Sequence, residues 1–336
     1  MIEPVFNATL MIFFLIILGG FLRWTRVLRP EADRSTMSLC INVLYPCLIF
    51  SKIMATPLRE NLVAYGILPI FGFCSVLVAM VILHFFTSLP KAVTGLENDA
   101  QRRTFLCTSA LYNYGYVPIP IIQFMYPEKP EYATALFIFI LGIELSVWLC
   151  VVPWIAGGLQ KGWWKKVLSV PFLTIFLAAF LNLAGFRMGV DGNIPQCIGK
   201  TIEHIGLAQI TMPLIFIGAM IYDQLAQRHV NFSSFRTYQV MGWTLFFRAF
   251  FFPCLMILTA LMMPGNPLLQ RILVIQAAMP TAMLIIMFTQ LYGGCSSVAT
   301  IAIMTTNLLT PIIAVFWIVL GMHLLERFPG GIVAFF

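Results

Sequence analysis

The sequence predicts an all-α polytopic membrane protein with ten transmembrane helices, arranged as a 5+5 inverted repeat. Hydrophobic residues make up 60% of the 336 residues and charged residues only 10%, whereas a soluble globular domain carries about 25% charged residues. Apolar runs of about 20 residues, the length that crosses a bilayer, recur from one end of the chain to the other. A weak internal repeat at about half the chain length predicts the arrangement of the helices.

Each predicted span is an apolar run between short polar segments. The first has no basic region before it and no cleavage site of small residues, so we expect a retained helix and not a signal peptide. The second and seventh each contain a proline, and the fourth and ninth contain stronger interruptions. The fifth, eighth and tenth carry polar side chains that are rare in hydrocarbon. The ten spans are expected at residues 5–22, 38–56, 62–89, 104–126, 132–156, 168–186, 203–224, 238–263, 268–292 and 296–324.

The basic residues predict the orientation of the chain. Ten spans place alternate loops on opposite sides of the membrane, and one set of loops holds twelve lysines and arginines against seven in the other set. The positive-inside rule then places both termini outside the cytoplasm. The segment Lys161–Lys166, KGWWKK, fits an anchor at the cytoplasmic interface. The net charge of +7 therefore needs no nucleic-acid partner.

Motifs for metal binding, redox chemistry and catalysis are missing from the sequence. The eight cysteines form neither a CxxC pair nor a metal-ligand spacing, and the four histidines are dispersed. The stretch IGKT at Ile198–Thr201 lacks the first glycine of a phosphate-binding loop. We therefore expect no metal, no cofactor and no enzymatic activity.

The internal repeat divides the chain into residues 1–166 and 167–336. Asn42–Phe50 (NVLYPCLIF) and Gln209–Ile217 (QITMPLIFI) both read polar amide, three residues, proline and an apolar run, at an offset of 167 residues. Because five spans are an odd number, a second copy enters the membrane from the opposite side. This predicts an inverted repeat with a binding site between the two halves.

Two spans in corresponding positions of the halves are interrupted near their centres. The fourth contains YNYGYVPIP, with Gly115, Pro118 and Pro120, and the ninth contains QAAMPTAM, with Pro280. A proline inside a helix deletes a backbone hydrogen bond, at a cost of about 3 kcal/mol or more. The freed carbonyls have to face protein or a watery cavity. The alternative is that these prolines only kink packed helices.

Two spans that cross at these breaks would form a binding site for an anion. Each proline is suited to begin a new half-helix, and the N-terminal end of a helix carries a partial positive charge. Because the two spans run in opposite directions, two positive ends meet near the centre of the bilayer without any lysine. The expected substrate-binding residues are Asn42, Asn113, Tyr114, Gly115, Pro118, Pro120, Pro280 and Thr281.

Polar residues in other spans are candidates for binding a coupling ion. Glu144 lies near the centre of the fifth span, where an ionisable group costs about 2.5–3.5 kcal/mol and usually faces a cavity or a partner. It binds a coupling proton or sodium ion, or it is a protonated acid buried in the fold. Asn307 and Thr310 either contact an ion or substrate or hydrogen-bond between helices. Arg248 is expected to extend to the cytoplasmic interface, the alternative being a counter-ion for Glu144.

Five motifs occur in a fixed order along the chain: NVLYPCLIF, YNYGYVPIP, QITMPLIFIGAMI, QAAMPTAMLIIMFTQLYGG and IMTTNLLTPII. Together they resemble the auxin efflux carrier family, which includes plant PIN-type carriers and bacterial malonate or malate permeases. The resemblance covers nearly the whole chain. It implies a fold shared with sodium/proton antiporters and bile-acid transporters, in which spans 4 and 9 cross.

The resemblance also implies that the helices form two domains with different functions. Spans 1, 2, 6 and 7 would form a scaffold and spans 3–5 and 8–10 a transport domain, with an elevator-type movement and a homodimer formed through the scaffold. In the family the substrate carboxylate binds at the crossing. The matching positions in this chain are Asn113, Gly115, Pro118, Pro280 and Thr281.

We therefore expect a secondary transporter of small organic anions, auxin-like or malonate-like carboxylates, in a bacterial inner (plasma) membrane. Its partners would be the anion, the lipid bilayer and a coupling proton or sodium ion. Leu284 is a departure, because many bacterial members resemble PTAVNAF where this chain has PTAMLII, so a less polar pocket and a larger or more hydrophobic anion are expected. The alternative is a membrane sensor or receptor that binds the ligand without transporting it.

Overall fold

The structure is a computed structural model that describes residues 2–158, 169–188, 192–226, 235–263 and 265–329. Within these ranges every regular element is a helix, and two isolated β-bridges are the only extended pairings. Among the described residues, six helices are long and apolar enough to cross a membrane. The polytopic α-helical class is thereby confirmed, whereas the number of ten spans and the inverted repeat remain predictions.

The helices of the first half coincide with the first five predicted spans. The second, third and fifth of these segments each consist of two or three helical elements that follow one another without a loop. The fourth is interrupted between α7 and α8. Their bounds are α1 (Ile2–Trp24), α2 (Asp33–Leu39), η2 (Cys40–Leu44), α3 (Tyr45–Met54), α4 (Leu62–Gly66), α5 (Leu68–Thr87), α6 (Lys91–Thr94), α7 (Asp99–Ala110), α8 (Pro118–Met125), α9 (Pro130–Ser146), η4 (Val147–Val151) and α10 (Val152–Ala156), with short 3-10 turns η1 (Pro30–Ala32) and η3 (Leu58–Asn61).

The helices of the second half follow the same plan, with an interruption between α16 and α17. The seventh segment begins earlier than predicted, because α13 extends back to Gln196. Their bounds are α12 (Val170–Leu183), α13 (Gln196–Ala226), α14 (Phe235–Leu245), η5 (Phe246–Phe251), α15 (Phe252–Leu261), α16 (Pro267–Ala277), α17 (Leu284–Tyr292) and α18 (Ser296–Arg327).

Three of the segments contain a π-helical turn, η2, η4 and η5, and a proline follows each turn by two residues. These prolines are Pro46, Pro153 and Pro253. A proline cannot donate to the carbonyl four residues earlier, and widening the preceding turn is one way for a helix to continue past it. The chain therefore remains helical on both sides of these prolines.

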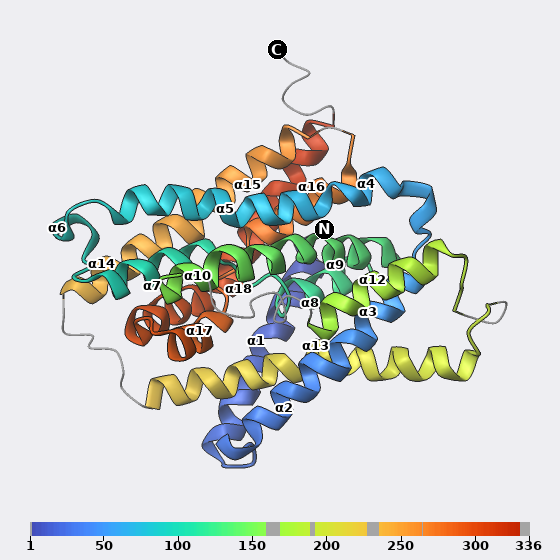
Figure 1. The fold of residues 1–336 in the computed structure, drawn as a ribbon, viewed down its shortest axis with the longest axis horizontal. Coiled ribbons are helices and arrows are strands. Elements are labelled where there is room, and N and C mark those ends of the chain that lie inside the picture. Colours follow the sequence, from blue (N-terminus) through green and yellow to red (C-terminus); the bar gives the residue numbers. More distant parts are fainter. Residues whose placement is uncertain (1, 159–168, 189–191, 227–234, 264, 330–336) are drawn as a thin grey trace.

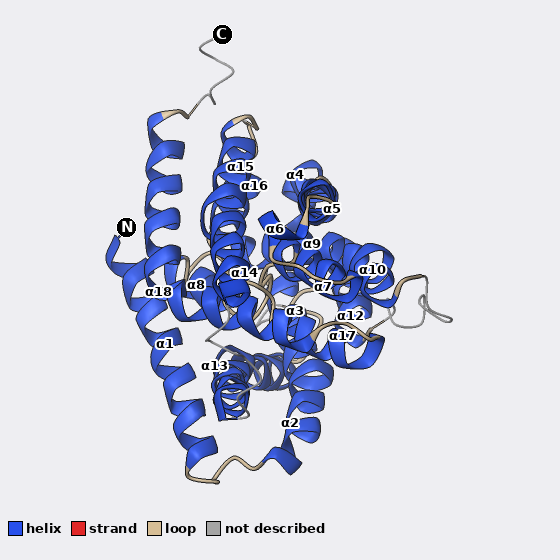
Figure 2. Cartoon of the chain, turned by 90° about the vertical axis from the view of Figure 1, so that its left-hand side faces the viewer, coloured by secondary structure: helices blue, strands red, loops and turns tan. Residues whose placement is uncertain are grey.

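The helices predicted to form the scaffold pack against one another. Helix α13 contacts α1 and α3, and α3 contacts α12. Figure 1 shows α13 and α2 along the lower edge of the molecule and α5 along the upper edge. Figure 2 shows α1 and α18 side by side along one side of the molecule. The division into a scaffold and a moving transport domain remains a prediction.

Helices α5 and α9 approach each other closely because each carries a glycine at the contact. A Cβ atom on Gly142 would overlap the backbone carbonyl of Pro69, and a Cβ atom on Gly72 would overlap that of Phe139. Small residues allow such backbone-to-backbone packing between membrane helices. The position of α9, which carries Glu144, is set by this contact.

Replacing Gly142 by valine is expected to destabilise the protein, because the new side chain has to displace backbone atoms of α5. Overpacking of this kind typically costs about 1–3 kcal/mol, so the melting temperature of the detergent-solubilised protein should fall by several degrees. Gly66→Ala is the matched control, since a Cβ atom there meets nothing within 4 Å. Equal melting temperatures for the two variants would contradict the close approach of α5 and α9.

Candidate functional site

The two interrupted segments meet in the middle of the molecule. Helix α7 ends at Ala110 and α8 begins at Pro118, while α16 ends at Ala277 and α17 begins at Leu284. The repeat offset of 167 residues carries Leu111 onto Ala278, so the residues that follow α7 and α16 correspond. The two predicted breaks are therefore present, and their equivalence under the internal repeat remains a prediction.

The extended chain of one break pairs with the extended chain of the other. The backbone N–H of Asn113 donates to the carbonyl of Pro280 (2.7 Å), and that of Ala282 donates to the carbonyl of Leu111 (3.0 Å). These bonds enclose an antiparallel bridge between Tyr112 and Thr281. The pairing satisfies backbone groups that have no helical partner, as an apolar surrounding requires.

Side chains from neighbouring helices bond to further backbone groups of the breaks. The carbonyl of Tyr114, which Pro118 leaves without a helical donor, accepts from Nε2 of Gln276 (3.1 Å). The carbonyl of Thr281 accepts from Nδ2 of Asn307 (3.2 Å). The backbone N–H of Thr281 donates to Oγ1 of Thr306 (3.1 Å). Both breaks are thus held in place by α16 and α18.

Replacing Gln276 by leucine is expected to destabilise the protein by about 1–3 kcal/mol, because a buried carbonyl of the break loses its donor. Gln276 is fully buried, and leucine has a similar volume. Gln239→Leu is the matched control, since Nε2 of Gln239 also donates to a carbonyl, that of Ala92, but in an exposed position. Urea or thermal unfolding in detergent should therefore separate the two variants, and equal stabilities would contradict the supporting role of Gln276.

A cavity of about 270 Å³ lies beside the paired breaks. Residues of both breaks border it, together with residues of η2, α3, α9, η4, α12 and α17. The lining residues are Ile41, Tyr45, Asn113, Tyr114, Gly115, Tyr116, Ile119, Glu144, Trp148, Ser169, Pro171, Ala282, Met283, Leu284, Phe288, Leu291 and Tyr292. We call this space the break cavity.

Hydrogen-bond donors are available at the break cavity. Nδ2 of Asn113 and the hydroxyl of Tyr45 have no hydrogen-bond partner among the described residues, although both atoms are buried. Oδ1 of Asn113 accepts from the backbone N–H of Val117 (3.4 Å), which turns the amide nitrogen away from that contact. A buried donor without a partner costs about 1–3 kcal/mol. The break cavity is therefore suited to a ligand that accepts hydrogen bonds.

The beginnings of two helices add partial positive charge to the break cavity. Helix α8 begins at Pro118, and α17 begins at Leu284, and residues adjoining both starts line the cavity. The dipole of a helix favours negative charge near its N-terminal end. In the first turn of α8 the prolines have no N–H, and the N–H of Ile119 donates to the carbonyl of Gly115 (3.1 Å), so α8 contributes through its dipole and not through free N–H groups. No lysine or arginine is among the residues that line the cavity, so a positive contribution there would come from the helix ends.

Glu144 supplies the one carboxylate among the residues that line the break cavity. It lies on α9, and its Oε1 accepts a hydrogen bond from the hydroxyl of Tyr114 (2.9 Å). An acid and a set of donors for an anion therefore share one small space. The negative charge of Glu144 would repel an anion bound there unless that charge is neutralised.

The predicted substrate-binding residues occupy different positions around the breaks. Asn113, Tyr114 and Gly115 line the break cavity, whereas the remaining predicted residues do not. Asn42 is exposed, and its amide donates to the carbonyl and hydroxyl of Ser38 (3.0 and 3.1 Å) in the same segment. Pro118 and Pro120 are buried in α8, and Pro280 and Thr281 are buried in the paired break.

The other candidates lie behind the breaks. Asn307 and Thr310 are on α18, where Thr310 donates to the carbonyl of Thr306 (3.0 Å) and Asn307 donates to the carbonyl of Thr281. Their role in ion binding remains a prediction. The expectation that Arg248 extends to the interface is wrong, because its side chain is buried with 2% exposure. Its Nε donates to the carbonyl of Met279 (3.1 Å), and the described residues give it no ion pair with Glu144.

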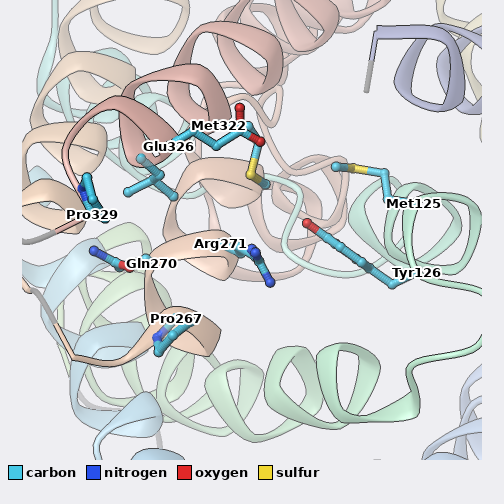
Figure 3. A pocket seen from close by; sticks show the side chains of 9 residues that line it. Met125, Tyr126, Pro267, Gln270, Arg271, Met322, Glu326 and Pro329 are labelled. Carbon is cyan, nitrogen blue, oxygen red and sulfur yellow. The ribbon is translucent and has the colours of Figure 1, made fainter.

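A larger cavity, of about 420 Å³, lies away from the breaks (Figure 3). Residues at the end of α8, the start of α16 and the end of α18 line it, among them Arg271, Tyr126 and Glu326. The guanidinium of Arg271 lies over the stacked rings of Tyr126 and Tyr132. None of the predicted binding residues contributes to this cavity, so its size does not make it the candidate site.

The described residues contain no cluster of three or more histidine, cysteine or acidic side chains that could hold a metal ion. The expected absence of a metal remains a prediction. Ligand binding at the break cavity would depend on hydrogen-bond donors, helix ends and one carboxylate.

Comparisons with known proteins identify related sequences. A family model described as membrane transport protein matches residues 4–156 and 155–318 of the chain. An uncharacterized transporter from Methanocaldococcus jannaschii is 23% identical over 325 residues, which cover 94% of this chain and 99% of that protein. Both matches extend across the residues of the two breaks.

Proposed function

Because the chain belongs to the membrane transport protein family, that of the auxin efflux carriers, we propose that it is a secondary transporter of small organic anions. The observation that carries the proposal is the break cavity, where buried donors without partners and the starts of two helices surround one space. Such a site favours a ligand with a negative charge and hydrogen-bond acceptors.

The dimensions and walls of the break cavity favour a small carboxylate with an apolar body. Its volume of about 270 Å³ is just below the range of about 300–1,000 Å³ that is usual for drug-sized ligands. Ile119, Leu284 and Phe288 provide apolar wall. Leu284, on which the expectation of a larger or more hydrophobic anion rests, is among these lining residues.

Glu144 is proposed to bind the coupling cation, a proton or a sodium ion. Two negative charges about 6 Å apart repel by about 3 kcal/mol at an effective dielectric constant of about 20. A carboxylate anion would therefore bind more tightly when Glu144 is neutralised. This coupling would let the gradient of one ion drive the transport of the other.

An elevator-type movement is proposed because the break cavity lies between the two predicted domains. Ile41, Tyr45 and Pro171 come from the predicted scaffold, and the breaks and Glu144 from the predicted transport domain. Movement of one group of helices against the other would open the cavity on alternate sides. The homodimer, the bacterial inner membrane and the non-cytoplasmic termini belong to the same proposal.

The test is ligand binding followed by transport with the purified protein. A panel of mono- and dicarboxylates should include compounds that raise the melting temperature in detergent, and uncharged amides of the same acids should not. In liposomes, a positive compound should show saturable uptake and accelerated exchange when unlabelled compound is loaded inside. Binding without uptake or exchange would support the alternative, a membrane sensor or receptor, and no binding by any anion would contradict the proposal.

A further inference from the structure

A second cavity, of about 160 Å³, lies on the other side of the paired breaks, between α5 and α15. Tyr112 lines this cavity, whereas its neighbour Asn113 lines the break cavity. Successive side chains of an extended chain point in opposite directions. The paired breaks therefore separate two spaces, and we call the second one the α5–α15 cavity.

A buried arginine forms part of the α5–α15 cavity. The guanidinium of Arg248 lies over the ring of Tyr112, with Cζ 5.0 Å from the ring centroid, and over Phe252 at 5.7 Å. Its Nε donates to Met279, but its Nη2 is buried and has no hydrogen-bond partner among the described residues. No acidic side chain is among the residues that line this cavity.

An arginine in this position favours an anion. The guanidinium stays protonated in proteins, and a buried charge is costly unless it is paired and hydrogen-bonded. The hydroxyl of Tyr112 is engaged with Ser75 (2.7 Å), so the nearest polar side chains do not complete the coordination. The free Nη2 donor and the positive charge together favour a carboxylate or a phosphate.

The surroundings of the cavity indicate how such an anion would arrive. The lining residues are otherwise mostly apolar, and Val78 and Cys74 at its edge are exposed. Helix α5 also exposes Val81 and Phe85, and α15 exposes Leu258, which is typical of surfaces that face lipid. The cavity holds about five groups of the size of a water molecule, enough for a charged head group but not for a long chain.

We propose that the α5–α15 cavity binds the anionic head group of an amphipathic molecule whose apolar chain extends into the bilayer. The head group is a carboxylate, as in a fatty acid, or a phosphate, as in an acidic phospholipid. Arg248 binds the head group, and the space between α5 and α15 admits it from the side. This site is distinct from the break cavity and does not depend on the proposed transport function.

Photolabelling of the full chain tests the proposal. The probe is a palmitate analogue with a diazirine close to its carboxylate, added to the protein in phosphatidylcholine nanodiscs, with adducts mapped by mass spectrometry. We expect adducts on α5 and α15 that oleate or phosphatidylglycerol displaces and oleyl alcohol does not. Displacement by oleate alone identifies a carboxylate, and displacement by both an anion of either kind. A phosphatidylglycerol analogue with a diazirine in its head group that labels α5 and α15, where the palmitate analogue does not, identifies a phosphate. Displacement by none, or equally by the alcohol, overturns the proposal.

Three variants separate binding from folding. Arg248→Gln removes the charge and is expected to lower labelling about tenfold, since a hydrogen bond to a charged group contributes that much to affinity. Val78→Trp leaves Arg248 in place and narrows the opening, so it is expected to lower labelling as well. Val81→Trp is the matched control, because Val81 is 49% exposed, Val78 is 45% exposed, and only Val78 lines the cavity. Equal labelling of Val78→Trp and Val81→Trp overturns the proposal even if Arg248→Gln fails to fold.

Discussion

Replacing Asn113 by alanine is expected to reduce anion transport about 10- to 100-fold at substrate concentrations below KM. Asn113 is 3% exposed, lines the break cavity and holds a donor, Nδ2, without a partner among the described residues. A hydrogen bond to a charged ligand contributes about 1.5–3 kcal/mol, which corresponds to this range of affinity. The measurement is the initial rate of uptake of a labelled carboxylate into proteoliposomes.

Two further variants make the result specific to the ligand. Asn113→Asp keeps the shape of the side chain but replaces the donor with a negative charge, so it should lose transport at least as completely as the alanine variant. Asn61→Ala serves as the matched control, since Asn61 is exposed at the start of α4 and makes no cap with its side chain. Wild-type transport by Asn113→Ala, with an unchanged melting temperature, would reject the assigned site.

Replacing Glu144 by glutamine is expected to abolish ion-driven accumulation while exchange of the anion continues. Glutamine still accepts the hydrogen bond from Tyr114, but it can neither bind nor release a proton, and it offers a sodium ion no charge. The measurement is uptake against a concentration gradient, driven by a pH gradient or, separately, by a sodium gradient. One of the two should drive accumulation by the wild type and neither should drive it in the variant.

Glu128→Gln is the matched control for this experiment, because Glu128 is exposed on the loop between α8 and α9. It should accumulate the anion as the wild type does. Undiminished accumulation by Glu144→Gln, under the gradient that drives the wild type, would exclude Glu144 as the site of coupling. Loss of both accumulation and exchange would assign Glu144 to anion binding or folding instead.

The positions of the two breaks were predictable because the cause is local. Pro118 and Pro280 each remove a helical hydrogen bond whatever the surroundings, and a repeat offset of 167 residues relates the two regions. The helical class and the family were predictable from composition and from ordered motifs, and the family match confirms the resemblance to the auxin efflux carriers. These features depend on residues that are close in sequence.

The side chains that complete the site were not predictable in the same way. In α13 and α18 the polar residues are not gathered on one face, so the sequence does not show which face packs inward. Asn42 was expected at the site, yet its neighbour Ile41 lines the break cavity, and the π-helical turn η2 includes both residues. Arg248 lies in a similar turn, η5, which changes the direction of a side chain relative to a regular helix.

The donors that hold the two breaks together have a mechanical consequence. They come from Gln276, Asn307, Arg248 and from the breaks themselves, all within the helices of the predicted transport domain. None of these bonds reaches α1, α3, α12 or α13. Sliding between the two groups of helices would therefore leave every one of these bonds intact, and the ligand would be carried by a preassembled unit that never has to be taken apart during a cycle.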